Sequence, residues 1–540
     1  MPVRFLRDPL SGAASQGVTS YETRTRLKKR SKTLPADFSP DSHHPKNAPR
    51  VPRQFQTRKE SSMKFSKLLT HVKRGNTTNL AGGQAFTQTP KGELVSILLT
   101  ATLEDSFYRK ASVTAKRVRE LVAAVDDKSF VAKAAIYARK EGGMRSVSHL
   151  VAAELARSVK GAEWTKRFYQ SVVRRPDDVL EILACHLATA GQPVPNSLKK
   201  GLGAALARFD EYQLAKYRRE SSELKLVDAV NLLHPPHTEA LRKLVRGELA
   251  PAQTWETKLT QAGTKARDEG EDLESLKADA WEELISSRKL GYFALLRNLR
   301  NILAQAPGSV DAALEMLVDE RLIAKSLVLP FRYLTAVEAV EQSQLPRAGD
   351  AMAAISEAAD KALANVPLFE GRTLVALDGS GSMTGRPLQI GSLFAAVLAK
   401  ANKGADVMIF SNDAEFIPVN RRDTTLTLAR EIARHAPGGG TSFHAIFEQA
   451  KSAYDRIVIL SDMQGWIGYS TPVSAFNAWK QRTGSDPRVF SFDLAGYGTL
   501  QFPERNVYCL AGFSDKTLQT MTLLEQDSNA LIREIESIQL

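Results

Sequence analysis

The sequence predicts a multidomain protein in which an all-α part precedes an α/β part. Two observations lead to this prediction. Between about residues 90 and 365, apolar residues recur at three- and four-residue steps, and no convincing strand interrupts them. From about residue 366, short apolar runs alternate with helical stretches, which is the pattern of a parallel sheet covered by helices on both faces.

Residues 1–62 are predicted to be a disordered basic extension. They are rich in Ser, Pro and Thr, and they hold 13 basic against 5 acidic residues with no lasting periodicity. The stretch "TRTRLKKRSK" (23–32) reads either as an RNA-gripping arm or as an extension without functional weight. The second reading arises because Met63 opens a segment that resembles a natural start.

Residues 63–366 form the predicted helical domain. Typical segments are "GELVSILLTATL" (92–103), "VTAKRVRELVAAV" (113–125) and "SHLVAAELARSV" (148–159), separated by short Gly- and Pro-containing breakers. Many helices of 10–15 residues in succession indicate a stacked antiparallel array rather than a single bundle.

Residues 367–540 form the predicted α/β domain. Its expected strands are the runs "RTLVALD" (372–378), "ADVMIFS" (405–411), "DRIVILSD" (455–462) and "RVFSFDLAG" (488–496). In open parallel sheets, ligands bind at the carboxyl ends of the strands. Polar side chains at those ends are therefore the first candidates for a site.

Charge and composition narrow the class of protein. The formal net charge is +13, and the basic surplus falls in the first two regions, whereas the α/β domain is close to neutral. Such a surplus indicates either binding to nucleic acid or an ordinary solvated surface, and charge alone does not separate the two. No apolar run is long enough to span a membrane, and the first residues lack the apolar core of a secretion signal. We therefore expect a cytoplasmic, monomeric protein.

Oxygen donors gather around the expected strand ends of the α/β domain. The sequence "DGSGS" places Asp378, Ser380 and Ser382 in one tight turn directly after a strand. Thr441 follows the glycine run "PGGG", and Asp462 ends the strand "IVILSD". Three hydroxyls and two carboxylates suit a small octahedral ion, Mg²⁺ in the first place and Mn²⁺ as the alternative. One position on the ion is left for an outside carboxylate or phosphate.

This constellation resembles the metal-ion-dependent adhesion site of von Willebrand A domains, which have a Rossmann-like fold. All five side-chain positions occur in the family's order and strand context. No lysine-bearing phosphate loop follows the glycines, and no nucleophile–base pair appears beside the hydroxyls. We therefore expect a protein that is not an enzyme.

Three segments of the helical domain resemble the Ro autoantigen family, whose helical part is called the TROVE domain. They are "PNSLKKGLGAALARFDEYQLAKYRRE" (195–220), "WEELISSRKLGYFALLRNLRNIL" (281–303) and "ERLIAKSLVLPFRYLTAVEAVE" (320–341). The likeness covers roughly residues 65–540. It implies a ring of HEAT-like helical repeats closed by the von Willebrand A domain.

The same resemblance implies a non-catalytic RNA-binding role. Small non-coding Y RNAs would bind on a basic outer surface, and single-stranded 3′ ends of misfolded or immature RNA would enter a central hole. Such a protein would act as a scaffold for decay and maturation by a 3′-to-5′ exoribonuclease such as polynucleotide phosphorylase. By position, Lys216 and His234 match the family's RNA-contacting lysine and histidine. "HPP" stands where the family often has "HLKP", so the contact near His234 lacks one basic neighbour.

Further basic side chains lie on or beside consecutive predicted helices and can share phosphate contacts with Lys216. These are Lys199, Lys200, Arg218 and Arg219. A second group lies around a Gly-Gly helix break and is a candidate lining of the hole. It comprises Arg139, Lys140 and Arg145. An alternative function, from a different class, is a metal-dependent protein-binding adaptor that uses the von Willebrand A site.

Overall fold

The computed structural model describes residues 76–540 except for short stretches. Those stretches are 88, 102, 104–109, 160, 219–222, 253, 327, 329, 469–470, 496, 498, 503–506, 512–517, 519–520, 523 and 526–529. The predicted extension, residues 1–62, therefore lies outside the described residues. Among the described helices, none combines the length and the apolar character needed to cross a bilayer.

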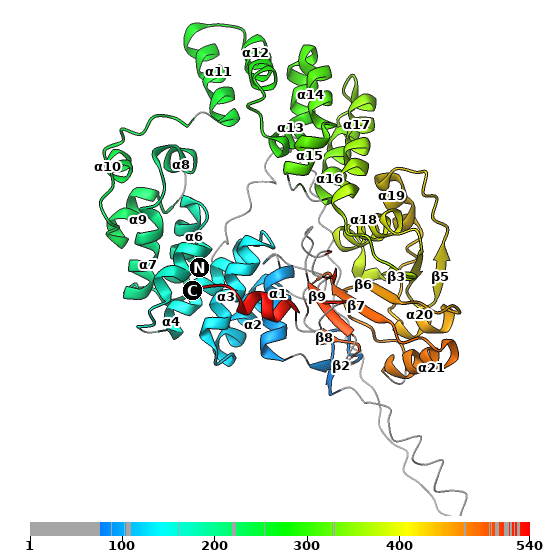
Figure 1. Cartoon of the computed structure of the whole chain (residues 1–540). Helices are drawn as coiled ribbons and strands as arrows, with labels where there is room; N and C mark the ends of the chain where they lie inside the picture. The colour runs from blue at the N-terminus through cyan, green and yellow to red at the C-terminus, as the bar shows by residue number, and fades with distance from the viewer. Residues whose placement is uncertain are drawn as a thin grey trace, which may run out of the picture. The chain divides into compact units, whose positions relative to one another are not determined.

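The predicted all-α region is observed (Figure 1). Its first helices are α1 (Pro90–Thr100), α2 (Ala111–Ala124), α3 (Lys128–Lys140), α4 (Ser146–Ser158), α5 (Thr165–Val172), α6 (Pro176–Ala190), α7 (Asn196–Leu206), α8 (Glu211–Lys216), α9 (Leu226–Leu233) and α10 (Glu239–Arg246). The remaining ones are α11 (Trp255–Glu269), α12 (Leu273–Ser286), α13 (Tyr292–Gln305), η1 (Pro307–Ser309), α14 (Val310–Leu317), α15 (Glu320–Ser326), α16 (Pro330–Glu341), α17 (Ala348–Lys361) and η2 (Ala362–Asn365).

Local sequence signals explain where several of these helices begin. Asp127, Thr238 and Asp272 are N-cap residues whose side chains accept a hydrogen bond from a backbone N–H in the first turn of α3, α10 and α12. Pro176 occupies the first position of α6, where its missing N–H is not needed. Gly247 ends α10 in the left-handed conformation that glycine adopts without strain.

The α/β domain contains a six-stranded sheet in the order β5-β4-β3-β6-β7-β9. Its elements are β3 (Thr373–Asp378), η3 (Gly381–Met383), α18 (Arg386–Ala401), β4 (Ala405–Phe410), β5 (Ala414–Ile417), α19 (Thr425–Arg434), α20 (Phe443–Gln449), β6 (Arg456–Ser461), α21 (Val473–Thr483), β7 (Arg488–Asp493), β9 (Val507–Ala511) and α23 (Ala530–Glu536). All neighbouring strands are parallel except β5, which pairs with β4 in the antiparallel sense.

Alternate residues of each central strand enter different cores. Val375 and Leu377 of β3 face α18 and α19 in one core, whereas Leu374 and Ala376 face α20 and α21 in another. The sheet is therefore buried on both faces, as its uninterrupted apolar strands predict. The Rossmann-like prediction is confirmed.

A small three-stranded sheet was not predicted from the sequence. It consists of β1 (Thr77–Thr78), β2 (Gln84–Thr87) and β8 (Thr499–Leu500), in the order β1-β2-β8. The first two strands precede α1, whereas β8 follows β7 of the α/β domain. This sheet joins the beginning of the helical region to the α/β domain.

The helical region has two cores. The first lies among α1–α10 and also takes in Ile535 of α23. The second lies among α12–α17 and continues without a break into the α18/α19 face of the sheet. Both ends of the helical region thus contact the α/β domain.

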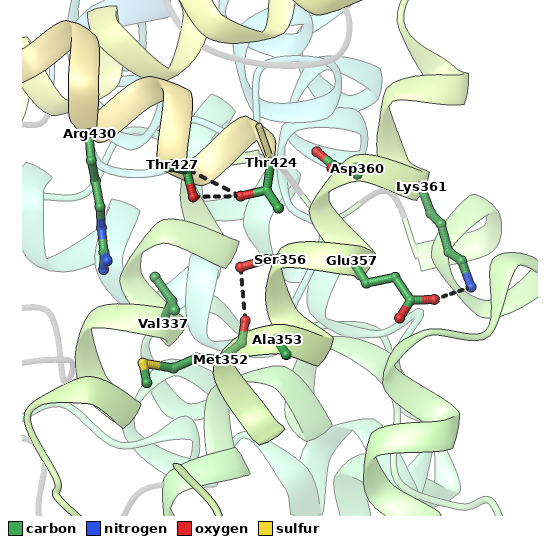
Figure 2. A pocket seen from close by; sticks show the side chains of 10 residues that line it. All are labelled: Val337, Met352, Ala353, Ser356, Glu357, Asp360, Lys361, Thr424, Thr427 and Arg430. Carbon is green, nitrogen blue, oxygen red and sulfur yellow. Dashed lines mark hydrogen bonds and ion pairs between the residues drawn. The ribbon is translucent and has the colours of Figure 1, made fainter. Parts of the chain in front are cut away.

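A groove of about 740 Å³ lies where α16 and α17 meet α19 (Figure 2). Figure 2 shows Met352 and Val337 on one side and Thr424 and Thr427 on the other. Beside it, Arg430 donates to Glu341 at 2.7 Å, which ties α19 to α16. None of the predicted site residues lines this groove.

Candidate functional site

The carboxyl ends of β3 and β6 bring the two predicted metal-binding carboxylates close together. These strands are adjacent and parallel, with Leu377 opposite Leu460. Asp378 therefore ends one strand beside the point where Asp462 follows the other. Both side chains are buried. The Oγ of Ser461 donates a 2.6 Å hydrogen bond to Oδ2 of Asp378 and fixes this carboxylate at the sheet edge.

The turn after β3 supplies the two serine hydroxyls. The N–H of Ser380 donates to Oδ1 of Asp378 at 2.9 Å, and the Oγ atoms of Ser380 and Ser382 lie 3.3 Å apart. A Cβ atom at Gly379 would lie 3.0 Å from a side-chain atom of β4, so a glycine is needed for the chain to pass this closely. The predicted clustering of these oxygens is observed.

The glycine loop before Thr441 is bonded to this turn. The N–H of Gly438 donates to the carbonyl of Gly379 at 2.9 Å, and the N–H of Gly381 donates to that of Gly439 at 3.0 Å. Gly438 and Gly439 have φ values of 73° and 84°, which other residues rarely adopt. These bonds hold the buried Thr441 beside the end of β3.

Ionising the two carboxylates is costly where they lie. Burial raises the pKa of Asp378 to about 6, although hydrogen bonds from Ser461 and Ser380 oppose the rise. Burial and the negative charge of Asp378 raise the pKa of Asp462 to about 7. Within the described part of the chain, Oδ2 of Asp462 is buried without a hydrogen-bond partner. Buried carboxylates in this condition, beside hydroxyl oxygens, fit a small divalent ion.

A third carboxylate at this edge was missed in the sequence. Asp493 ends β7, is fully buried, and contributes to the raised pKa of Asp462 through its negative charge. Its signal was the same as that of Asp462, a carboxylate at the end of an apolar strand. Among the described residues, no three His, Cys, Asp or Glu side chains are arranged to hold a metal.

The cations of the predicted outer RNA surface lie on neighbouring helices. Lys200 on α7, Lys216 at the end of α8 and Arg218 just beyond it are exposed, and Lys199 is half-buried. His234 is exposed directly after α9. Arg219 lies outside the described residues.

Packing between α7 and α9 places His234 beside α7, the helix that carries Lys199 and Lys200. A Cβ atom at Gly203 of α7 would lie 3.3 Å from Cα of Pro235 and 3.4 Å from the carbonyl oxygen of Leu233. His234 lies between these two residues with a φ of 46°, a left-handed helix end that is uncommon for residues other than glycine. Lys199 is one helical turn before Gly203 on the same face.

Aromatic rings accompany these cations. The Nζ of Lys216 lies 5.9 Å from the ring centre of Tyr212 and 5.7 Å from that of Tyr217. Tyr217 also contacts a second cation, because the guanidinium of Arg175 lies 4.9 Å from the centre of its ring. Tyr212 is 47% exposed. Packing against cations is thus observed for both tyrosines.

The three candidates for the hole differ in their surroundings. Lys140 is exposed. Arg139 donates to Oδ2 of Asp178 at 2.8 Å, and Arg145 donates to Oδ1 of the same carboxylate at 2.9 Å. His149 places Nε2 3.3 Å from Oδ1 of Asp178. The two arginines thus belong to a mostly buried ion-pair cluster, and their predicted contact with RNA stays a prediction.

The comparisons with known proteins agree with this architecture. A family model described as the TROVE domain matches residues 88–247 and 245–378, and one described as the Ro60 vWA domain matches residues 372–522. A solved structure, the crystal structure of the Deinococcus radiodurans RO (RSR) protein, superposes with a TM-score of 0.56 at 20% identity. That match covers 80% of this chain and 99% of the other, and it shows the same fold.

Two curated relatives are more limited in extent. The RNA-binding protein RO60 of Deinococcus radiodurans is 25% identical over 257 residues, which are 42% of this chain and 48% of that protein. Telomerase protein component 1 of Rattus norvegicus is 23% identical over 348 residues, 47% of this chain but 13% of that protein. The chain thus spans about half of the one and a small part of the other. From the family models, which follow each other from residue 88 to residue 522, the chain belongs to the Ro family, whose members join a TROVE domain to a Ro60-type von Willebrand A domain.

Proposed function

We propose that this protein binds structured, Y-like small non-coding RNA through the exposed cations around α7, α8 and α9, without chemistry of its own. The observation that supports this most directly is the exposure of Lys200 on α7 and His234 after α9, two helices that pack against each other, together with Lys216 on α8, which α10 links to α9. Cations on one face can contact several phosphates of one strand. The name of the RO60 relative, an RNA-binding protein, supports the same substrate class.

The test is a gel shift with a structured Y-like RNA. The double variant Lys216→Ala, His234→Ala should bind at least tenfold more weakly, because each lost phosphate contact costs on the order of 1 kcal/mol. The slope of log affinity against log salt should fall by about one for the lost lysine contact. Lys403→Ala, which removes an exposed lysine from the α/β domain, is the matched control. Equal affinity of the double variant and the control would remove both residues from the interface.

A finer role follows from the family resemblance. Single-stranded 3′ ends of misfolded or immature RNA would enter a central opening near Lys140, and the protein would present them to a 3′-to-5′ exoribonuclease in the cytoplasm. Crosslinking followed by sequencing of the bound RNA tests this directly. Reads that lack free 3′ ends near the crosslinked position would contradict it.

We also propose that the α/β domain holds Mg²⁺, or Mn²⁺ in its place. Asp378, Ser380, Ser382, Thr441 and Asp462 would supply its ligands. When bound, the ion would offer a Lewis-acidic position to an outside oxygen anion. The protein's own part is to orient the oxygens and to keep them dry, as the burial of both carboxylates indicates. Calorimetry on Asp378→Ala should show no divalent-ion binding, and RNA affinity should be unchanged.

One observation favours a second candidate function, capture of a partner protein's carboxylate by the bound ion. Trp466 is 52% exposed, and its ring lies against the glycine loop, since a Cβ atom at Gly440 would lie 2.6 Å from it. Aromatic side chains such as tryptophan are enriched in protein-binding surfaces. Loss of partner binding on chelation, with RNA binding intact, would distinguish this function from the first.

A further inference from the structure

The segment that leads into the helical region is bonded to the loop that carries a predicted metal ligand. The side-chain Nδ2 of Asn79 donates to the carbonyl of Gly465 at 2.6 Å. The N–H of Leu80 donates to Oε1 of Gln464 at 2.7 Å. A Cβ atom at Gly83 would lie 2.0 Å from the carbonyl oxygen of Gly465, so the two segments touch through their backbones. We call residues 77–87 the entry hairpin, since β1 and β2 within it pair antiparallel and α1 follows.

Gln464 connects this contact to the metal centre. Its side chain is fully buried. Its N–H donates to Oδ1 of Asp462 at 3.0 Å, and its Nε2 donates to the Asp462 carbonyl at 3.2 Å. The Oε1 of Gln464 accepts from the N–H of Leu80 in the entry hairpin. One residue thus holds a metal-site carboxylate and the entry hairpin at the same time.

The same loop reaches the other side of the metal centre. The N–H groups of Trp466 and Ile467 both donate to the carbonyl of Thr441 at 3.2 Å. The loop from Asp462 to Ile467 therefore contacts both predicted ligand positions outside the β3 turn. Any change in the separation of Asp462 and Thr441 must move this loop, and with it the surface on which the entry hairpin rests.

We infer that Gln464 is a positioning residue that couples occupancy of the metal centre to docking of the entry hairpin. This inference rests on the proposed metal site. A bound ion would draw the oxygens of Asp462 and Thr441 toward one point and so fix the loop between them. The fixed loop would hold Gln464 and Gly465 in place for Leu80 and Asn79. Because coupling between two sites is reciprocal, docking of the entry hairpin must strengthen ion binding by the same factor.

The coupling links the two domains. The entry hairpin continues directly into α1, and its strand β2 pairs with β8 of the α/β domain. Metal binding would therefore strengthen the attachment of the start of the helical region to the α/β domain. The proposed RNA surface on α7–α9 belongs to the same first core as α1.

The experiment measures both sides of the coupling in the full chain, with Mg²⁺ as the probe. Amide hydrogen exchange of residues 77–87 is followed with and without Mg²⁺, and Mg²⁺ affinity is measured by calorimetry. Gly83→Ala pushes the entry hairpin away from Gly465 without touching a predicted ligand. Gly263→Ala on α11 is the matched control, because a Cβ atom there meets nothing within 4 Å.

In the unaltered protein, Mg²⁺ should slow exchange in the entry hairpin. Gly83→Ala should speed this exchange and weaken Mg²⁺ binding by at least about fivefold, the lower end of coupling between sites, and the control should do neither. Gln464→Met, which keeps the bulk but cannot accept from Leu80, should show the same two losses and serves if Gly83→Ala does not fold. Unchanged Mg²⁺ affinity in a variant whose entry hairpin exchanges freely would overturn the coupling alone. Absence of Mg²⁺ binding in the unaltered protein would overturn the metal site itself and the inference with it.

Discussion

Replacing Asp178 by Asn should destabilise the first core strongly. The Asp178 side chain has no exposed surface, and that of Arg139 beside it is only 10% exposed. Its carboxylate accepts from Arg139 at 2.8 Å and from Arg145 at 2.9 Å, and His149 lies 3.3 Å away. Removing one partner of a buried ion pair leaves an uncompensated charge, which costs about 3–5 kcal/mol of unfolding free energy.

Asparagine is the right replacement because it removes the negative charge of Asp178 but keeps an oxygen that can accept from the backbone at the start of α6. Asp178 also accepts from the backbone N–H groups of Arg174 and Arg175 at 2.8 and 3.1 Å at the start of α6. An amide oxygen can still accept those bonds. Glu120→Gln is the matched control: it also removes one charge from an ion pair in the first core, but Glu120 and its partner Arg117 are 47% and 40% exposed, so its loss should cost no more than about 1 kcal/mol.

The unfolding free energy lost in Asp178→Asn should depend on pH. Burial alone would lower the pKa of His149, but hydrogen bonds with Asp178 and Glu181 raise it above 6.5. The stability that this histidine contributes is therefore complete below about pH 6.5 and is lost as pH rises through its folded-state pKa. Burial would raise the pKa of Asp178, but His149, Arg139 and Arg145 hold it below 3.8, so its own contribution is lost only in acid. The deficit of Asp178→Asn should thus be larger near pH 6 than near pH 8.5.

The assay is hydrogen exchange of the amides of α4 and α6, which reports the local opening free energy without assuming that the whole chain unfolds at once. A deficit below about 1 kcal/mol, equal to that of Glu120→Gln, would refute the assignment of a buried ion-pair cluster. So would a deficit that does not change with pH. In either case Arg139 and Arg145 would be available for the RNA contact that the sequence suggested.

Three further predictions concern the metal site, the RNA surface and the domain contact. Burial raises the pKa values of Asp378 and Asp462 to about 6 and 7, so below about pH 6 Mg²⁺ binding should release protons and its affinity should rise by about tenfold per pH unit for each proton released; calorimetry at that pH in two buffers that shows no proton release would contradict this. Tyr217→Leu should weaken RNA binding several-fold in a gel shift because Arg175 and Lys216 lose their shared ring, and an unchanged affinity would limit the ring to packing. Glu341→Ala should lower the free energy of unfolding by less than about 1 kcal/mol, because the ion pair of Glu341 with Arg430 of α19 is partly exposed. A larger loss would mean that this ion pair acts together with other contacts.

The metal-site residues could be predicted because their positions follow from local rules. An apolar strand that ends in Asp378 and a second that ends in Asp462 must meet at one edge if both strands are parallel and adjacent. Asp493 follows the same rule, but the strand expected over residues 488–496 runs past it, whereas β7 ends at Asp493. The existence and order of the helices followed equally well from apolar periodicity.

Other features depend on partners that are distant in sequence. Arg145 lies in a basic, glycine-containing stretch, and its 32- and 33-residue separation from Asp177 and Asp178 hides their pairing. Gln464 contacts Leu80 across 384 residues. The entry hairpin itself has only short strands around a glycine pair, so no alternation of apolar residues marks it. Such contacts are decided by tertiary packing, which periodicity and spacing do not encode.

The helix α23 has a consequence for the order in which the protein is completed during synthesis. Ile535 is part of the first core, and Lys133 of α3 donates to the carbonyl of Glu536 across 403 residues. Part of the apolar face of α3 therefore stays uncovered until α23 has been translated. Molecular chaperones would be expected to engage α3 during that interval, and a bulky insertion beside α23 would be felt at α3, 403 residues away in sequence.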